Sequence, residues 1–290
     1  MIDYDYIKPE NIKEVISLLK EYGPGATLIA GGTDVMVNIR NKKLSPGVLV
    51  SLRGLKDLQY IKKDKGYHIG GMTTHRMLEK SELVKSELSA LHDGASKVGS
   101  VQIRNVATIG GNICNAAPSA DTAGPLLVLD AVVVLEGAEG KRRIPVAEFY
   151  TGPSRTVRRE DEVLVEFDIP EDNSNYGSAY WKHSRRKAMD LPILGVAVAL
   201  KMAEDRTILD ARIGLSVLAP TPIRAPKAEE YLKGKTLRDD VLAEAGKIAS
   251  SEASPRDSLR GKAWYRSDMI KVFFPRMARL AAERKGMVME

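Results

Sequence analysis

Cysteine is almost absent from this chain of 290 residues, because Cys114 is the only one. A single thiol cannot form an intrachain disulfide, and it cannot supply the four thiolates that an iron–sulfur cluster usually needs. Aromatic residues account for only 6% of the chain, and no aromatic stacking motif of RNA-binding domains is present. The sequence therefore argues against a disulfide framework, a resident iron–sulfur cluster and a nucleic-acid-binding protein.

Long apolar runs are also missing. The two longest, Leu126–Leu135 and Leu191–Leu200, fall short of the roughly 20 residues that a membrane-spanning helix requires, so each is expected to be a buried strand or core helix. The first ten residues, MIDYDYIKPE, contain acids and no apolar stretch of the kind found in secretory signals. We therefore expect a cytoplasmic protein with no membrane span.

The sequence also does not match the common metal-binding and nucleotide-binding motifs. The four histidines lack any ligand spacing such as HExxH, so each is expected to be structural or on the surface and no metal site is predicted. Gly23-Pro24-Gly25 resembles the start of a dinucleotide fingerprint, but Leu28 stands where the third glycine is required. Gly234-Lys235-Thr236 resembles the end of a phosphate-binding loop, but Glu229 replaces its first glycine. The histidines are His68, His75, His92 and His183.

The charge that is present gives a formal net value of +6. Such a surplus is compatible with an acidic partner protein or a phosphate-bearing cofactor. The basic residues are spread along the chain, which again disfavours nucleic acid.

The hydrophobic pattern predicts an α+β protein. Helices are expected over Pro9–Tyr22, His75–Glu79, Glu82–Val98, Leu237–Ala249 and Gly261–Arg284. Strands are expected over Ala26–Ala30, Val48–Leu52, Leu126–Leu135, Val163–Ile169, Tyr176–Trp181, Gly195–Met202 and Leu209–Val217, with a hairpin over Tyr60–Ile69. A polar loop, Pro170–Asn175, is suited to a domain boundary.

Two glycine pairs carry the chemical argument. They lie in LIAGGTD, Leu28–Asp34, and in ATIGGN, Ala107–Asn112, and each is expected to follow an apolar strand. Glycine allows positive φ and lets an anion approach backbone amides closely, and the hydroxyls of Thr33 and Thr108 could add phosphate hydrogen bonds. A pyrophosphate could bridge both segments, although two ordinary tight turns would have the same sequence.

The sequence around these glycine pairs resembles that of a known family. RNVATIGGNICNAAPSAD, Arg104–Asp121, is similar throughout to a signature of the FAD-binding flavoproteins of xanthine dehydrogenase and carbon monoxide dehydrogenase. The resemblance continues through Asp161–Pro170, Ala179–Pro192 and Ala263–Phe273. It implies a two-lobed FAD-binding domain of the vanillyl-alcohol-oxidase-like, PCMH-type fold over residues 1–175, with lobes of about 1–55 and 56–175. A smaller α+β domain would follow over 176–290.

The same resemblance implies roles for single residues. The FAD pyrophosphate would be held by two segments, Asp121 would bind near the adenosine ribose, and Lys182 would lie near the flavin. Leu164 and Leu191 would pack around the isoalloxazine, and Val98 would lie beside the cofactor. No catalytic acid or base is implied. The pyrophosphate segments consist of Leu28, Ile29, Ala30, Gly31, Gly32, Thr33, Asp34 and Val35, and of Thr108, Ile109, Gly110, Gly111 and Asn112.

Proteins of this family divide one redox reaction among subunits. The resemblance implies partners for this chain: a small subunit with two-iron two-sulfur clusters and a large subunit with molybdopterin. Electrons would pass through FAD to an external acceptor such as NAD or a quinone. Two alternatives remain, a self-sufficient flavin oxidase on the same fold and a phosphate-ligand-binding module without redox activity.

Overall fold

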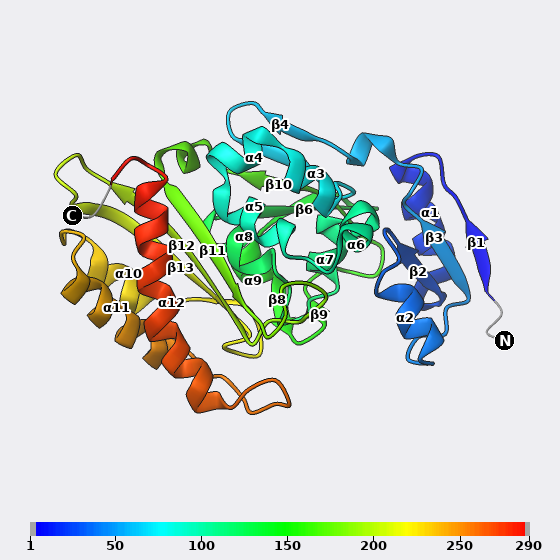
Figure 1. Ribbon diagram of the computed structural model, residues 1–290. Helices are drawn as coiled ribbons and strands as arrows, with labels where there is room; N and C mark the ends of the chain where they lie inside the picture. Colours follow the sequence, from blue (N-terminus) through cyan, green and yellow to red (C-terminus); the bar gives the residue numbers. More distant parts are fainter. Residues whose placement is uncertain (1–3, 288–290) are drawn as a thin grey trace.

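The computed structural model describes residues 4–287 as three units in a row, with the two ends of the chain at opposite ends of the molecule (Figure 1). The first unit is a parallel sheet of three strands in the order β1-β3-β2. Helix α1 begins after Asn11, whose side chain accepts a hydrogen bond from the Glu14 amide. Its elements are β1 (Asp5–Ile7), α1 (Ile12–Tyr22), η1 (Gly23–Gly25), β2 (Ala26–Ile29), α2 (Val35–Arg40) and β3 (Val48–Ser51).

The middle unit is built on an antiparallel sheet of five strands in the order β4-β5-β10-β6-β7. Its strands are β4 (Ile61–Lys63), β5 (Tyr67–Gly70), β6 (Val132–Gly137), β7 (Gly140–Pro145) and β10 (Val163–Ile169), and a separate pair is formed by β8 (Tyr150–Gly152) and β9 (Arg155–Thr156). Its helices are η2 (Lys56–Leu58), α3 (His75–Lys80), α4 (Glu82–Glu87), α5 (Ser89–Ser96), α6 (Val101–Val106), α7 (Ile109–Cys114), α8 (Ala123–Val128) and α9 (Val146–Phe149).

A shared hydrophobic cluster joins these two units. Val15 of α1 and Val50 of β3 pack with Val134 of β6 and Val165 of β10, and all four side chains are buried. The first sheet is thereby held against the middle one, and the loop that follows β2 is brought to the helices of the middle unit.

The third unit is an antiparallel sheet of four strands in the order β11-β12-β13-β14. Strand β12 shows the two-residue period of a strand buried on both faces. Val196 and Val198 join the core under the last helices, whereas Ala197 and Ala199 pack with residues of the middle unit. The elements are η3 (Glu171–Asn175), β11 (Gly177–His183), β12 (Leu194–Met202), β13 (Ile208–Ser216), β14 (Ile223–Arg224), α10 (Pro226–Leu232), α11 (Asp239–Glu252) and α12 (Ala263–Glu283).

The predicted α+β class is confirmed, and so are most of the predicted helices and strands. Three expectations are wrong. The second glycine pair does not follow a strand, because α6 precedes it and Gly110 and Gly111 lie inside α7. Leu126–Leu135 divides into the end of α8 and most of β6, and Glu82–Val98 divides into α4 and α5 at Leu88. Residues 1 and 290, the outer limits of the predicted domains, lie outside the described residues.

Within residues 4–287, no helix is long and apolar enough to cross a membrane.

Candidate functional site

The first glycine segment follows the end of β2. Gly32 has φ of +73°, a backbone conformation that glycine adopts without the strain a side chain would bring. A Cβ on Gly31 would lie 2.2 Å from the carbonyl oxygen of Val106, so only glycine lets the loop touch the end of α6. The first segment is therefore held directly against the start of the second.

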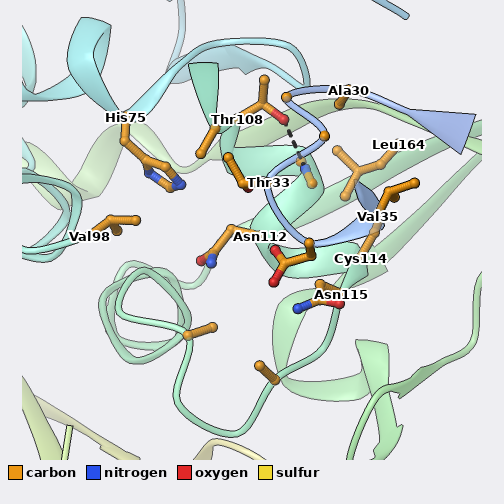
Figure 2. Close-up of a pocket in the computed structure, with 18 of the residues that line it drawn as sticks. Ala30, Thr33, Val35, His75, Val98, Thr108, Asn112, Cys114, Asn115 and Leu164 are labelled. Carbon is orange, nitrogen blue, oxygen red and sulfur yellow. Dashed lines mark hydrogen bonds between the residues drawn. The ribbon is translucent and has the colours of Figure 1, made fainter. Parts of the chain in front are cut away.

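The second glycine segment forms the beginning of α7. The Thr108 Oγ1 atom accepts a hydrogen bond of 3.1 Å from the Gly111 amide and so caps the helix, as the dashed line in Figure 2 marks. A Cβ on Gly110 would lie 2.5 Å from the Gly71 carbonyl oxygen. The segment after β5 runs alongside, since the His75 amide donates to Ala107 and the Ile109 amide donates to Thr73. This backbone pairing fixes the second segment on the middle unit.

The two segments form one wall of a cavity of about 620 Å³. That volume lies in the range of small-molecule and cofactor sites. Except for Ile29 and Ile109, all the residues predicted to contact the cofactor line it. The side chains of Ile29 and Ile109 instead belong to hydrophobic clusters of the first and the middle unit, respectively. The predicted residues that line the cavity are Leu28, Ala30, Gly31, Gly32, Thr33, Asp34, Val35, Val98, Thr108, Gly110, Gly111, Asn112, Asp121, Leu164, Lys182 and Leu191.

Asp121 and Lys182 form a buried ion pair at the cavity wall. The Lys182 Nζ atom lies 2.7 Å from Asp121 and donates to the Lys97 carbonyl oxygen, and the Tyr180 hydroxyl donates to the same carboxylate at 3.2 Å. Burial raises the pKa of Asp121 to about 6, against the lowering influence of the Lys182 ammonium. The sequence assigned these residues to different parts of the cofactor, but the fold brings their side chains together.

Asp34 also faces the cavity, and burial raises the pKa of its carboxyl. Its side chain does not cap α2. A carboxylate is a hydrogen-bond acceptor only, which suits hydroxyl groups better than phosphate oxygens.

The loop that closes the cavity comes from the third unit. The Met189 amide donates to the Gly99 carbonyl oxygen, and the Asp190 carboxylate accepts from the amides of Arg185 and Arg186. Met189 and Leu191 line the cavity and are 56% and 45% exposed. This loop is therefore the solvent-facing wall, made from residues far along the chain from both glycine segments.

The sequence interpretation missed His75. Its ring is completely buried, it lines the cavity, and neither ring nitrogen has a hydrogen-bond partner within residues 4–287. Burial, with a smaller effect of the Arg104 guanidinium, lowers the pKa of His75 to about 4. Gly70-Gly71, a third glycine pair directly after a predicted strand, was the available signal for this part of the site.

Cys114 lines the cavity too, and burial raises its pKa to about 11, so the thiol stays protonated at neutral pH. In the described part of the chain, no three His, Cys, Asp or Glu side chains gather as metal ligands would.

Comparison with known proteins shows which family has this fold. The family model described as the FAD binding domain in molybdopterin dehydrogenase matches residues 2–172, and the CO dehydrogenase flavoprotein C-terminal domain matches residues 179–281. The xanthine dehydrogenase FAD-binding subunit of Escherichia coli O157:H7 is 33% identical over 290 residues, which cover 99% of each chain. The carbon monoxide dehydrogenase medium chain of Hydrogenophaga pseudoflava is 31% identical and covers 92% of each.

The solved structures agree. A chain of the carbon monoxide dehydrogenase from Hydrogenophaga pseudoflava superposes with a TM-score of 0.92 at 31% identity, covering 97% of this chain and 98% of that one. Fold, cavity and family models together define an FAD-binding flavoprotein. The chain belongs to the family of FAD-binding medium subunits of the molybdenum hydroxylases, the oxidoreductases that include xanthine and carbon monoxide dehydrogenases.

Proposed function

We propose that this chain relays electrons within a molybdenum hydroxylase complex. Its FAD would take electrons from iron–sulfur clusters on a small subunit and pass them to an external acceptor such as NAD or a quinone. A large subunit with molybdopterin would oxidise the organic substrate. The observation that carries the proposal is the cavity where two glycine segments meet, in a chain whose single cysteine cannot hold a cluster.

The residues of the cavity fit a dinucleotide. Gly32 lines the cavity at positive φ, and the Thr33 and Thr108 side chains lie around the same space in Figure 2. The ring nitrogens of His75, which also face it, have no hydrogen-bond partner among residues 4–287. A buried polar group without a partner costs free energy that a polar ligand would recover. The buried ring nitrogens of His75 therefore favour a polar ligand in this cavity.

We assign the pyrophosphate to the two glycine segments, where the amides of the first segment and the hydroxyls of Thr33 and Thr108 would be the donors. In the second segment the Gly110 and Gly111 amides already donate to Gly71 and Thr108. Asp34 would accept hydrogen bonds from ribose hydroxyls, a role that suits its carboxylate better than a phosphate contact. Asp121 and Lys182 form a single donor-and-acceptor pair, and we propose that both contact one part of the cofactor. Val98, Leu164 and Leu191 would pack against its rings.

Bound flavin supplies the redox chemistry, because it exchanges electrons either singly or in pairs. The protein's part is to bind and orient the ring and to cover it: the Met189–Leu191 loop forms the exposed wall, and the buried ion pair places fixed charges beside the cavity. No side chain need act as a general acid or base in such a relay. A cytoplasmic location remains a prediction.

Anaerobic absorbance of the bound flavin tests the relay. The isolated holoprotein should lose its visible absorbance with dithionite but keep it when offered aldehydes, purines or carbon monoxide. With the small and large subunits added, the correct substrate should remove the absorbance. The matched control omits only the small subunit, and the absorbance should then persist. Rapid reduction by substrate in the isolated chain would contradict the relay and favour the self-sufficient oxidase.

A further inference from the structure

His75 is a completely buried polar side chain that the fold leaves without hydrogen-bond partners inside the described chain. In Figure 2 its ring points into the cavity, toward the space between Thr33 and Asn112, with Val98 beside it. Its backbone is fixed, because the His75 amide donates to the Ala107 carbonyl oxygen at 3.0 Å. The side chain thus enters the cavity from a rigid position, and a bound ligand is the natural source of its missing hydrogen bonds.

The surroundings of His75 favour the neutral imidazole. Burial disfavours its charged form, and the nearby Arg104 guanidinium repels a second positive charge. Arg104 is itself paired with Glu79, at 3.0 Å and 3.2 Å, and also donates to the Val98 carbonyl oxygen. Glu79 is therefore already engaged by a guanidinium.

A neutral imidazole has one N–H donor and one nitrogen acceptor. Phosphate oxygens at neutral pH are mainly acceptors and would satisfy only the N–H. The ribityl hydroxyls and the pyrimidine edge of a flavin offer both donors and acceptors. Either uncharged half of FAD therefore matches both ring nitrogens, whereas the pyrophosphate matches one, and titration with ADP distinguishes the riboflavin half from the adenosine half.

We propose that His75 is a positioning residue that hydrogen-bonds the uncharged riboflavin half of FAD as a neutral imidazole. The inference rests on the proposed FAD site. It adds a polar contact from the segment after β5, in addition to the two glycine segments, and it assigns that contact to one half of the cofactor.

Calorimetric titration of the full chain with FAD, FMN and ADP tests this assignment. FMN carries the riboflavin half, and ADP carries the adenosine and pyrophosphate. His75→Leu should weaken FAD and FMN by a similar factor of roughly 10, the effect of leaving a ligand hydrogen bond unmade. ADP binding should not change. His75→Gln, which keeps a donor and an acceptor, should recover part of the loss.

A matched control is His68→Leu. His68 lies on β5, contacts Glu166 and the Asp64 carbonyl oxygen, and does not line the cavity, so FAD affinity should stay at the wild-type value. The folded state is checked by thermal unfolding without ligand. The His75→Leu apoprotein should melt at or above the wild-type temperature, because leucine removes an unpaired buried polar group. A purely structural histidine would instead give a lower melting temperature.

The outcomes separate the two levels of the proposal. If the wild-type chain binds neither FAD nor FMN, the FAD site itself is wrong. If the wild type binds FAD and His75→Leu binds it equally well, only the role of His75 is wrong. An equal loss for ADP would place the contact on the adenosine or the pyrophosphate and overturn the assignment to the riboflavin half.

Discussion

Gly32 and Gly234 share a φ of +73°, but only Gly32 lines the cavity. Replacing either by valine should destabilise the fold by about 1–2 kcal/mol, because a side chain is strained in this conformation. Gly32→Val should also abolish FAD retention, since the added side chain would press on Ile29 and Met36 and shift the backbone that lines the cavity, whereas Gly234→Val should keep full flavin content. Flavin-to-protein ratios of the purified variants, with melting temperatures, measure both effects. Full flavin in folded Gly32→Val would contradict the site.

The lowered pKa of His75 predicts a pH dependence of stability for the apoprotein. The folded pKa of about 4 lies below the unfolded value of 6.5, so the unfolded chain binds more protons between these values. Stability should therefore fall as the pH decreases from 6.5 to 4, by roughly 3 kcal/mol at most from this residue. Urea unfolding of wild type and His75→Leu across that window measures the difference. Parallel pH profiles would show that His75 does not titrate this way.

The sequence predicted several single residues of the site, but it did not predict the contacts between them. The signature around Arg104–Asp121 led to Asp121, and a second stretch led to Lys182, yet their ion pair joins β11 to a loop before α8. No local pattern encodes a contact between residues so far apart. His75 was missed for a related reason, because a lone histidine in a sequence says nothing about whether its ring is buried without partners.

Helix α7 has an unusual composition for a helix, with two glycines in six residues. Glycine disfavours helix interiors, and the sequence therefore suggested a turn. The cap from Thr108 and the close contact of Gly110 with Gly71 override that preference. Element boundaries were predictable where apolar periodicity was strong, as in α12, and failed where a short helix depends on tertiary contacts.

The cap of α7 should matter for FAD as well as for stability. Thr108→Val removes the oxygen that accepts from the Gly111 amide and should cost about 1 kcal/mol of unfolding free energy. FAD affinity should fall too, because the second glycine segment loses its fixed start. Ser81→Ala is the control: Ser81 caps α4 through the Val84 amide, outside the cavity. It should lose similar stability and no affinity. Unchanged FAD binding in both variants would separate the cap from the site.

The cavity depends on the whole molecule. The predicted FAD-binding domain ends at residue 175, and its limits remain a prediction, but Lys182, Met189 and Leu191 form part of the cavity wall. A fragment of residues 1–175 would also uncover Ala90 and Val128, which pack against β12. We expect that fragment to bind FAD at least about tenfold more weakly than the whole chain, a loss of over about 1.4 kcal/mol of binding free energy, and to retain less flavin when purified in parallel. Retention equal to wild type would show that the third unit is dispensable.

The order of the strands in the middle sheet determines when the sheet can form during synthesis on the ribosome. Gly70 of β5 pairs with Glu166 of β10. On one side, therefore, β5 pairs with a strand that lies far away in the sequence. A ribosome adding roughly 5–20 residues per second would deliver Leu191 about ten to thirty seconds after Leu28. The central sheet lacks β10 until Ile169 has been made, and the cavity lacks part of its wall until Leu191 has been made. The complete site therefore exists only after Leu191 has been made, and a shortage of flavin would leave finished chains with an empty cavity rather than stopping synthesis.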